Sequence, residues 1–123
     1  MNGEYFCVHG GISTKLETLD QVNEIERFVD PGESECLFID LLWADPIKRK
    51  LCKLHEELKN DDRDISVKFS LRTLEGFLEK NQLKALIRGH EEKCYGHKFH
   101  LWRGEDEDPP CITIFSAPNY CQH

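Results

Sequence analysis

The sequence predicts a mixed α/β fold built around one hydrophobic core. Three short apolar runs rich in strand-forming residues each end in a polar loop, and apolar residues recur at helical spacing between them. The length of 123 residues, with 39% hydrophobic and 32% charged residues, suits one globular domain. No repeat, low-complexity tract or linker divides the chain. We therefore expect residues 1–123 to belong to a single domain.

The first predicted strand covers residues 5–8 and stops at His9, where two following glycines permit a tight turn. A short amphipathic helix is expected within residues 18–28, because its apolar residues lie three apart. These are Leu19, Val22, Ile25 and Phe28. Pro31 and Gly32 would follow the end of this helix.

A second helix is predicted over residues 47–58, with Asp45-Pro46 as its start and Asn60 as its stop. The third helical pattern covers residues 71–78. It leads into a buried strand at residues 85–87, which ends at the segment Arg88-Gly89-His90-Glu91. The clearest strand, residues 111–115, is followed by a polar loop containing Pro118, which cannot continue a ladder.

Three strand ends therefore deliver polar residues that could share one rim of a sheet, namely His9, His90 and Tyr120. Spacing alone leaves two interpretations open. Each histidine could be a hydrogen-bonded turn residue or a metal ligand, and Tyr120 could be a half-buried tyrosine or part of a binding pocket.

Charge and composition exclude several classes of function. The formal net charge of -7 argues against a nucleic-acid partner, whose phosphates require clustered lysine and arginine. The acidic run at residues 105–108 is typical of a solvated loop. No stretch approaches the roughly 20 apolar residues of a membrane span, and the first residues do not resemble a signal peptide. We expect a cytoplasmic or nuclear protein whose six scattered cysteines are reduced.

Four segments, in order, resemble successive motifs of the phosphoprotein phosphatase family. They are Phe6-Cys7-Val8-His9-Gly10-Gly11-Ile12-Ser13, Leu41-Leu42-Trp43-Ala44-Asp45-Pro46, Arg88-Gly89-His90-Glu91 and Ile112-Thr113-Ile114-Phe115-Ser116-Ala117-Pro118-Asn119-Tyr120-Cys121. Within the family the chain is most similar to the calcineurin catalytic branch. The resemblance implies a calcineurin-like metallophosphoesterase fold, a two-sheet β-sandwich flanked by helices, of which this chain would be the carboxy-terminal part.

The resemblance also implies a chemistry. Members of the family hydrolyse phosphoserine and phosphothreonine in proteins with two metal ions of Fe, Zn or Mn type and a bridging water. By position, His9 and His90 would be metal ligands, Arg63 would grip the substrate phosphate, and Tyr120 would line the phosphate pocket. The family pattern has glycine after this arginine, where the chain has Asp64, so Arg63 could instead be a plain surface arginine paired with its neighbour. Trp43 and Asp45 match as structural residues, a packed indole and a helix-start or turn carboxylate.

The family motifs Gly-Asp-x-His-Gly, Gly-Asp-x-Val-Asp-Arg-Gly and Gly-Asn-His-Glu, which supply the metal carboxylates and the general-acid histidine, have no counterpart here. The chain is therefore expected to be incomplete at both ends and inactive in isolation. Phosphoprotein substrates, a calcineurin B-like regulatory subunit and calmodulin would be partners of the longer protein, the last two through regions absent here.

Two alternatives stay open at this point. The chain could be a non-catalytic, phosphatase-like binding protein. It could also be a zinc-binding interaction module, with ligands drawn from Cys94, His97, His100, Cys121 and His123, although these lack the paired short spacings of structural zinc sites.

Overall fold

The computed structural model describes residues 1–32 and 35–122 as two sheets and three α-helices. The larger sheet has four strands in the order β1-β5-β7-β6, and the smaller has three in the order β2-β4-β3. The strands are β1 (Tyr5–Val8), β2 (Asp45–Pro46), β3 (Glu57–Lys59), β4 (Val67–Phe69), β5 (Ala85–Arg88), β6 (His97–His100) and β7 (Cys111–Ile114). The helices are α1 (Leu19–Asn23), α2 (Leu37–Trp43) and α3 (Leu71–Lys80), with a 3₁₀ turn η1 at Tyr120–Gln122. The mixed α/β, two-sheet prediction is confirmed.

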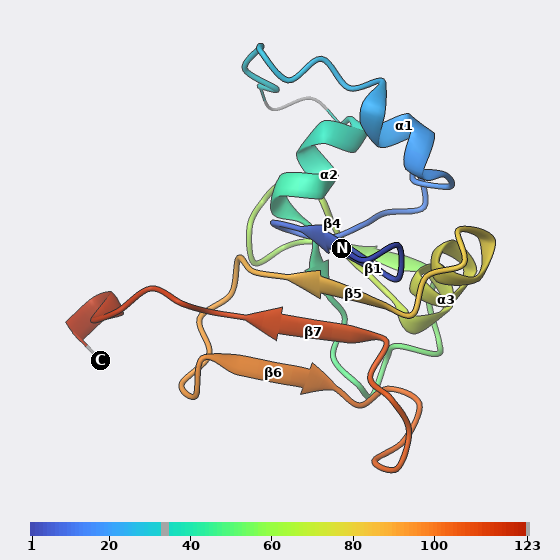
Figure 1. Cartoon of the computed structure of the whole chain (residues 1–123). Helices are drawn as coiled ribbons and strands as arrows, with labels where there is room; N and C mark the ends of the chain where they lie inside the picture. The colour runs from blue at the N-terminus through green and yellow to red at the C-terminus, as the bar shows by residue number, and fades with distance from the viewer. Residues whose placement is uncertain (33–34, 123) are drawn as a thin grey trace.

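The larger sheet brings the predicted loops to one edge. Strands β1, β5 and β7 run parallel, so their carboxyl ends meet at the same side, where Figure 1 shows three arrowheads pointing the same way. The register aligns Val8 with Arg88 and Arg88 with Thr113. His9 and His90 each follow a strand end that lies in this row, as the sequence predicted.

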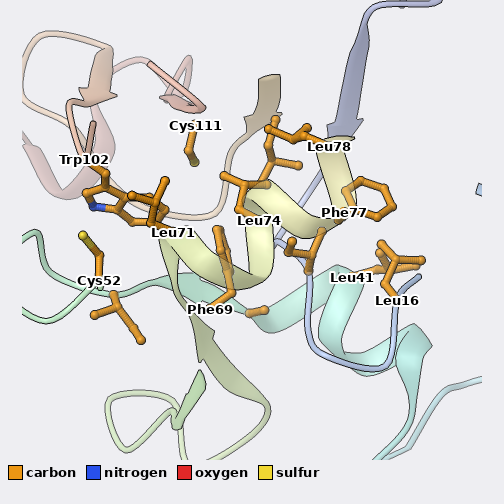
Figure 2. Close-up of a cluster of buried hydrophobic side chains, with 14 residues drawn as sticks. Leu16, Leu41, Cys52, Phe69, Leu71, Leu74, Phe77, Leu78, Trp102 and Cys111 are labelled. Carbon is orange, nitrogen blue, oxygen red and sulfur yellow. The ribbon is translucent and has the colours of Figure 1, made fainter. Parts of the chain in front are cut away.

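Helix α3 forms as its sequence pattern predicts. The Ser70 side chain accepts a hydrogen bond from the Thr73 amide (3.2 Å), which caps the first turn. The buried face of the helix consists of Leu71, Leu74, Phe77 and Leu78. Figure 2 shows these side chains gathered with Phe69 and Trp102, whose rings meet edge to face at 6.1 Å. This cluster is the core that joins the two sheets.

The helix predicted over residues 47–58 is wrong. Turns lead from β2 into β3 instead. Backbone groups that a helix would need are hydrogen-bonded to distant residues: the Ile47 amide donates to the Phe69 carbonyl (2.9 Å), and the Leu71 amide donates to the Cys52 carbonyl (3.1 Å). Ile47 and Cys52 are buried, whereas Leu54, which the helical pattern placed on the apolar face, is 71% exposed. The apolar residues here are spaced as in a helix, but hydrogen bonds to the neighbouring sheet hold this segment in another conformation.

Other differences concern short elements. The first predicted helix is confirmed only over five residues, α1, and Phe28 beyond it is 99% exposed. Helix α2 and strands β2, β4 and β6 lay outside the predicted elements, and β3 begins inside the helix wrongly predicted over residues 47–58. Runs of two to seven residues give too few repeats of a period to be recognised. Within the part of the chain described, none of the helices is long and apolar enough to cross a bilayer.

A buried histidine in β6 makes the stability depend on pH. His100 is 5% exposed, its Nε2 lies 2.8 Å from Thr113 Oγ1, and burial lowers its pKa from 6.5 to about 3. Below pH 6.5 the unfolded chain takes up a proton that the folded chain refuses. Stability from this group is therefore full above pH 6.5 and is lost as the pH falls toward 3, by at most about 1.4 kcal/mol per pH unit.

We predict that the difference in unfolding free energy between the native protein and His100→Gln shrinks by about 1 kcal/mol per unit between pH 6 and 4. Urea unfolding at pH 7, 6, 5 and 4 measures it. His97→Gln, at an exposed position on the same strand, is the control. A difference that stays constant across this range would contradict the assignment.

Candidate functional site

Two histidines from distant parts of the sequence meet at the carboxyl edge of the larger sheet. His9 Nε2 lies 3.1 Å from His90 Nδ1, and the two rings stand edge to face with centroids 5.0 Å apart. The indole of Trp43, at the end of α2, lies edge-on to His90 at 5.4 Å. Trp43 is 39% exposed, so it is a wall of this site rather than the packed indole that the sequence suggested.

Glycines allow the loop that carries His9 to lie directly on α2. A Cβ on Gly10 would lie 2.5–2.6 Å from backbone atoms of Leu42 and Trp43, closer than any side chain tolerates. The Gly10 amide donates to the Leu41 carbonyl (2.8 Å), and the Gly89 amide donates to the His9 carbonyl (3.0 Å). These backbone contacts fix His9 between α2 and the loop after β5, which explains the glycine in this motif physically.

His90 occupies an unusual backbone conformation. Its φ of 67° lies in the left-handed region, which costs a non-glycine residue on the order of 1 kcal/mol or more. Arg63 Nη2 donates to the His90 carbonyl (3.1 Å) and helps to hold this turn. Burial lowers the pKa of His90 to about 4, and the nearby Arg63 charge acts in the same direction. The imidazole is therefore neutral at physiological pH, the form that can bind a cation.

Asp45 ties Arg63 to the interior. Its Oδ2 accepts from Arg63 Nε and from Asn60 Nδ2, both at 3.0 Å, while its Oδ1 accepts from Arg88 Nη2 at 2.9 Å. Burial alone would raise the pKa of Asp45, but the bonds from Asn60 and Arg63 and the charge of Arg88 bring it below its ordinary value. Asp45 lies in β2 and is buried, so it is neither the helix-start nor the turn carboxylate that was expected. Its bonds to Asn60, Arg63 and Arg88 do give it a structural role.

Arg88 is buried next to the site and hydrogen-bonds to several of the segments that form it. Its side chain is 0% exposed, and its donors reach the carboxylates of Asp45 and Glu91, the carbonyls of Gly10 and Ala44, and the Thr113 hydroxyl. A buried arginine is tolerated because these acceptors satisfy its charge and its donors. It connects the loop after β1, the end of α2 and the loop after β5, the three segments that surround the histidine pair.

Arg88 lies within one of the four motifs, but no role was predicted for it. The signal was available: a charged residue closes the apolar strand Ala85–Arg88, and a charge in a buried strand requires buried partners. The distant partner, Asp45, carries no local pattern that pairs it with Arg88 or Arg63, and neither does Asn60, which also donates to Asp45.

The two imidazoles fit a shared cation, although they do not complete its site. Nitrogens that bind one Zn-type ion at 2.0–2.1 Å lie roughly 3.0–3.4 Å apart, which matches the separation of His9 Nε2 and His90 Nδ1. The same distance also suits an N–H···N hydrogen bond between them. No group of three His, Cys, Asp or Glu side chains in residues 1–32 and 35–122 is arranged to hold a metal.

The structure places Arg63 beside the histidines but Tyr120 apart from them. Arg63 pairs with Asp45 and not with its neighbour Asp64. The Tyr120 ring packs edge-on against Phe115 at 5.1 Å and is 47% exposed. Figure 1 shows the chain after β7 running past the edge of the sheet and away from it, with η1 near its end. The role predicted for Tyr120 therefore has no counterpart in these contacts and stays a prediction.

The proposed zinc ligands do not converge either. His97 Nδ1 lies 3.1 Å from the Tyr95 carbonyl, and His100 lies against Thr113, while Cys94 and Cys121 are exposed thiols. The last ligand in that reading, His123, lies outside the described residues. Nothing in the described part supports a zinc-binding module.

Comparison with known proteins assigns the fold and the motifs to a family. The sequence pattern of the calcineurin-like phosphoesterases matches residues 1–94. The serine/threonine-protein phosphatase 2B catalytic subunits A1 and A2 of Saccharomyces cerevisiae are 39% and 34% identical over 98% of this chain. A solved S. cerevisiae protein serine/threonine phosphatase with similarity to human phosphatase PP5 superposes with a TM-score of 0.78, at 31% identity over 98% of this chain.

The chain spans 23% and 24% of the length of the two phosphatase 2B subunits and 34% of the solved chain. The likeness nevertheless runs through nearly all of the residues present, includes both sheets, and contains the loops that carry His9 and His90. The chain belongs to the calcineurin-like phosphoesterase family, with serine/threonine-protein phosphatases as its relatives.

Proposed function

We propose that this chain supplies one side of the catalytic centre of a metal-dependent protein serine/threonine phosphatase. The observation that supports it most is the meeting of His9 and His90 at 3.1 Å with Arg63 alongside. In this proposal the two imidazoles hold one of two metal ions of Fe, Zn or Mn type. The phosphatase relatives act as longer chains, so the activity is proposed for the longer protein.

Arg63 would bind the substrate phosphate. Its Nε and Nη2 are held by Asp45 and the His90 carbonyl, and its Nη1 has no hydrogen-bond partner in the described residues. The side chain is 31% exposed, and its bonds to Asp45 and the His90 carbonyl fix its orientation. Nη1 and the second N–H of Nη2 would form the fork that donates to a phosphate without first being ordered.

The metal ions, when bound, would supply an activated water and neutralise charge on the phosphoryl oxygens. The chain's own contribution is to orient. Asp45 and Arg88 hold Arg63 and the His90 loop, Trp43 shields one side of His90, and the His90 imidazole stays neutral. Hydrolysis of phosphate monoesters needs up to roughly 28 kcal/mol of barrier reduction, which two imidazoles and one arginine do not provide.

We predict that the purified chain binds inorganic phosphate through Arg63 but does not turn over phosphoserine peptides at enzyme-like rates, even with Mn²⁺. Arg63→Lys keeps the charge and removes the fork, so it should weaken phosphate binding about fivefold or more. Titration followed by arginine side-chain NMR signals measures this. Arg72→Lys, at a position 74% exposed, is the matched control. Equal affinities for the native chain and Arg63→Lys would exclude Arg63 as the phosphate ligand.

A second candidate function is binding of phosphoproteins without hydrolysis. It uses the same observation as the phosphate site, the guanidinium of Arg63 held in place by Asp45 and the His90 carbonyl, which could bind a phosphate without any metal. The two functions differ when the chain is extended to the length of its relatives: a phosphatase gains metal-dependent turnover, and a binding protein does not.

A further inference from the structure

A cavity opens beside the candidate site and has a charge opposite to that of the whole chain. Its volume is about 540 Å³, and it lies between the segment after β2 and strand β6. Asp45 and Glu91, both bonded to Arg88, form the wall that it shares with the site. Asp45 also accepts a hydrogen bond from Arg63 (3.0 Å), so the cavity lies next to the Arg63 site, with this buried carboxylate between them.

The cations of the cavity exceed its available anions. Lys48, Arg49, Lys68 and Lys98 line it. Its three carboxylates are already engaged, since Asp45 and Glu91 bind Arg88 and Asp62 binds Lys68 at 2.5 Å. Arg49 pairs with Glu105, so Lys48 and Lys98 carry the uncompensated positive charge. In the described ranges, Lys48 and Lys98 form no ion pair within 4.0 Å. Both are exposed side chains, so their ammonium groups can turn toward a ligand in the cavity.

The cavity also has an apolar wall. Ile47 and Trp102 are buried at its base, and Leu51 and Phe99 are exposed, at 39% and 52%. His100 is neutral there, because burial lowers its pKa to about 3. A positive rim above an apolar floor suits a peptide that alternates acidic and apolar side chains.

The chain itself provides an example of such a contact. Glu105, from the acidic loop at residues 105–108, lies 3.6 Å from Arg49 at the rim. Both side chains are largely exposed, so this pair is weak and can be replaced by a carboxylate from another chain. The net charge of -7 disfavours binding of acidic peptides to the chain in general. A local positive cavity is therefore the place where such a peptide would bind.

We propose that this cavity binds an acidic segment next to the phosphorylated residue of a protein substrate, with Lys48 and Lys98 as specificity-determining residues. That the bound segment belongs to a phosphorylated protein substrate rests on the proposed phosphatase function. The binding itself does not require phosphate or metal, because Lys48 and Lys98 have no bond to Arg63 or to the histidines in the described residues.

The test is fluorescence anisotropy of the 123-residue chain with a labelled ten-residue peptide in which glutamate alternates with leucine around a central serine. We expect saturable binding that is roughly fivefold weaker for the double variant Lys48→Gln/Lys98→Gln at low salt. Lys50→Gln/Lys53→Gln changes the net charge equally at exposed positions outside the cavity and should leave the affinity within about 1.5-fold. A peptide with glutamine in place of glutamate should bind as weakly to the native chain as the glutamate peptide binds to the cavity variant.

Three outcomes overturn the proposal: no binding of the glutamate peptide, equal weakening in both double variants, or equal affinity for the glutamine peptide. If sedimentation instead shows self-association that is lost in Lys48→Gln/Lys98→Gln while the peptide does not bind, a second copy of the chain is the occupant and the proposal is wrong. The phosphatase proposal is tested separately, since Arg63→Lys should weaken binding of the phosphorylated peptide and not of the unphosphorylated one.

Discussion

Replacing Arg88 with methionine should lower the free energy of unfolding by about 3–5 kcal/mol. The side chain is 0% exposed, and its loss leaves the Asp45 carboxylate, itself only 7% exposed, without its fully buried charged partner. The carbonyls of Gly10 and Ala44 lose a donor as well. Urea unfolding at pH 7 measures the change. If the native chain is stable by no more than about 3–5 kcal/mol, the variant is expected to be unfolded even without urea, and that result also agrees with the prediction.

The control for this prediction is Arg72→Met. Arg72 lies on the exposed face of α3, 3.7 Å from the Glu56 carboxylate, and its replacement should change the free energy of unfolding by less than about 0.5 kcal/mol. The double variant Asp45→Asn/Arg88→Met should lose less than the sum of the two single variants, because the buried charge that Arg88→Met strands is removed. A loss below about 1 kcal/mol for Arg88→Met would show that the network does not stabilise the site.

Much of the larger sheet followed from the sequence. Strands β1, β5 and β7 are short, apolar and bounded by glycine or proline, so local patterns define them, and parallel strands necessarily bring His9 and His90 to one edge. Helix α3 was equally clear, because four apolar residues share one face and Ser70 precedes them. In these elements local preference and tertiary burial agree.

The smaller sheet did not follow from the sequence, for a physical reason. Its strands have two or three residues each, and they exist because Ile47 and Glu57 pair with β4 and its flanks rather than through any local pattern. The Asp45 network has the same origin. A carboxylate at residue 45 gives no local sign that it will meet arginines at residues 63 and 88.

The second large effect concerns metal binding. His9→Ala and His90→Ala should each weaken binding of Mn²⁺ by on the order of 10- to 100-fold, since the two imidazoles are the converging ligands of the site. Combining both substitutions should add little, because either one alone breaks the shared site. His55→Ala removes an exposed histidine and is the matched control. Calorimetric titration of the metal alone measures all four variants against the native chain.

The claim that His9 and His90 share one metal ion can be tested by the paramagnetic broadening that Mn²⁺ causes in the histidine side-chain NMR signals. We expect the His9 and His90 imidazole signals to disappear together at the lowest metal concentration, before those of His55, His97 and His100. In His9→Ala the His90 signal should survive that concentration. Broadening that affects exposed His55 and His97 first, or that reaches His90 equally in His9→Ala, would contradict the claim.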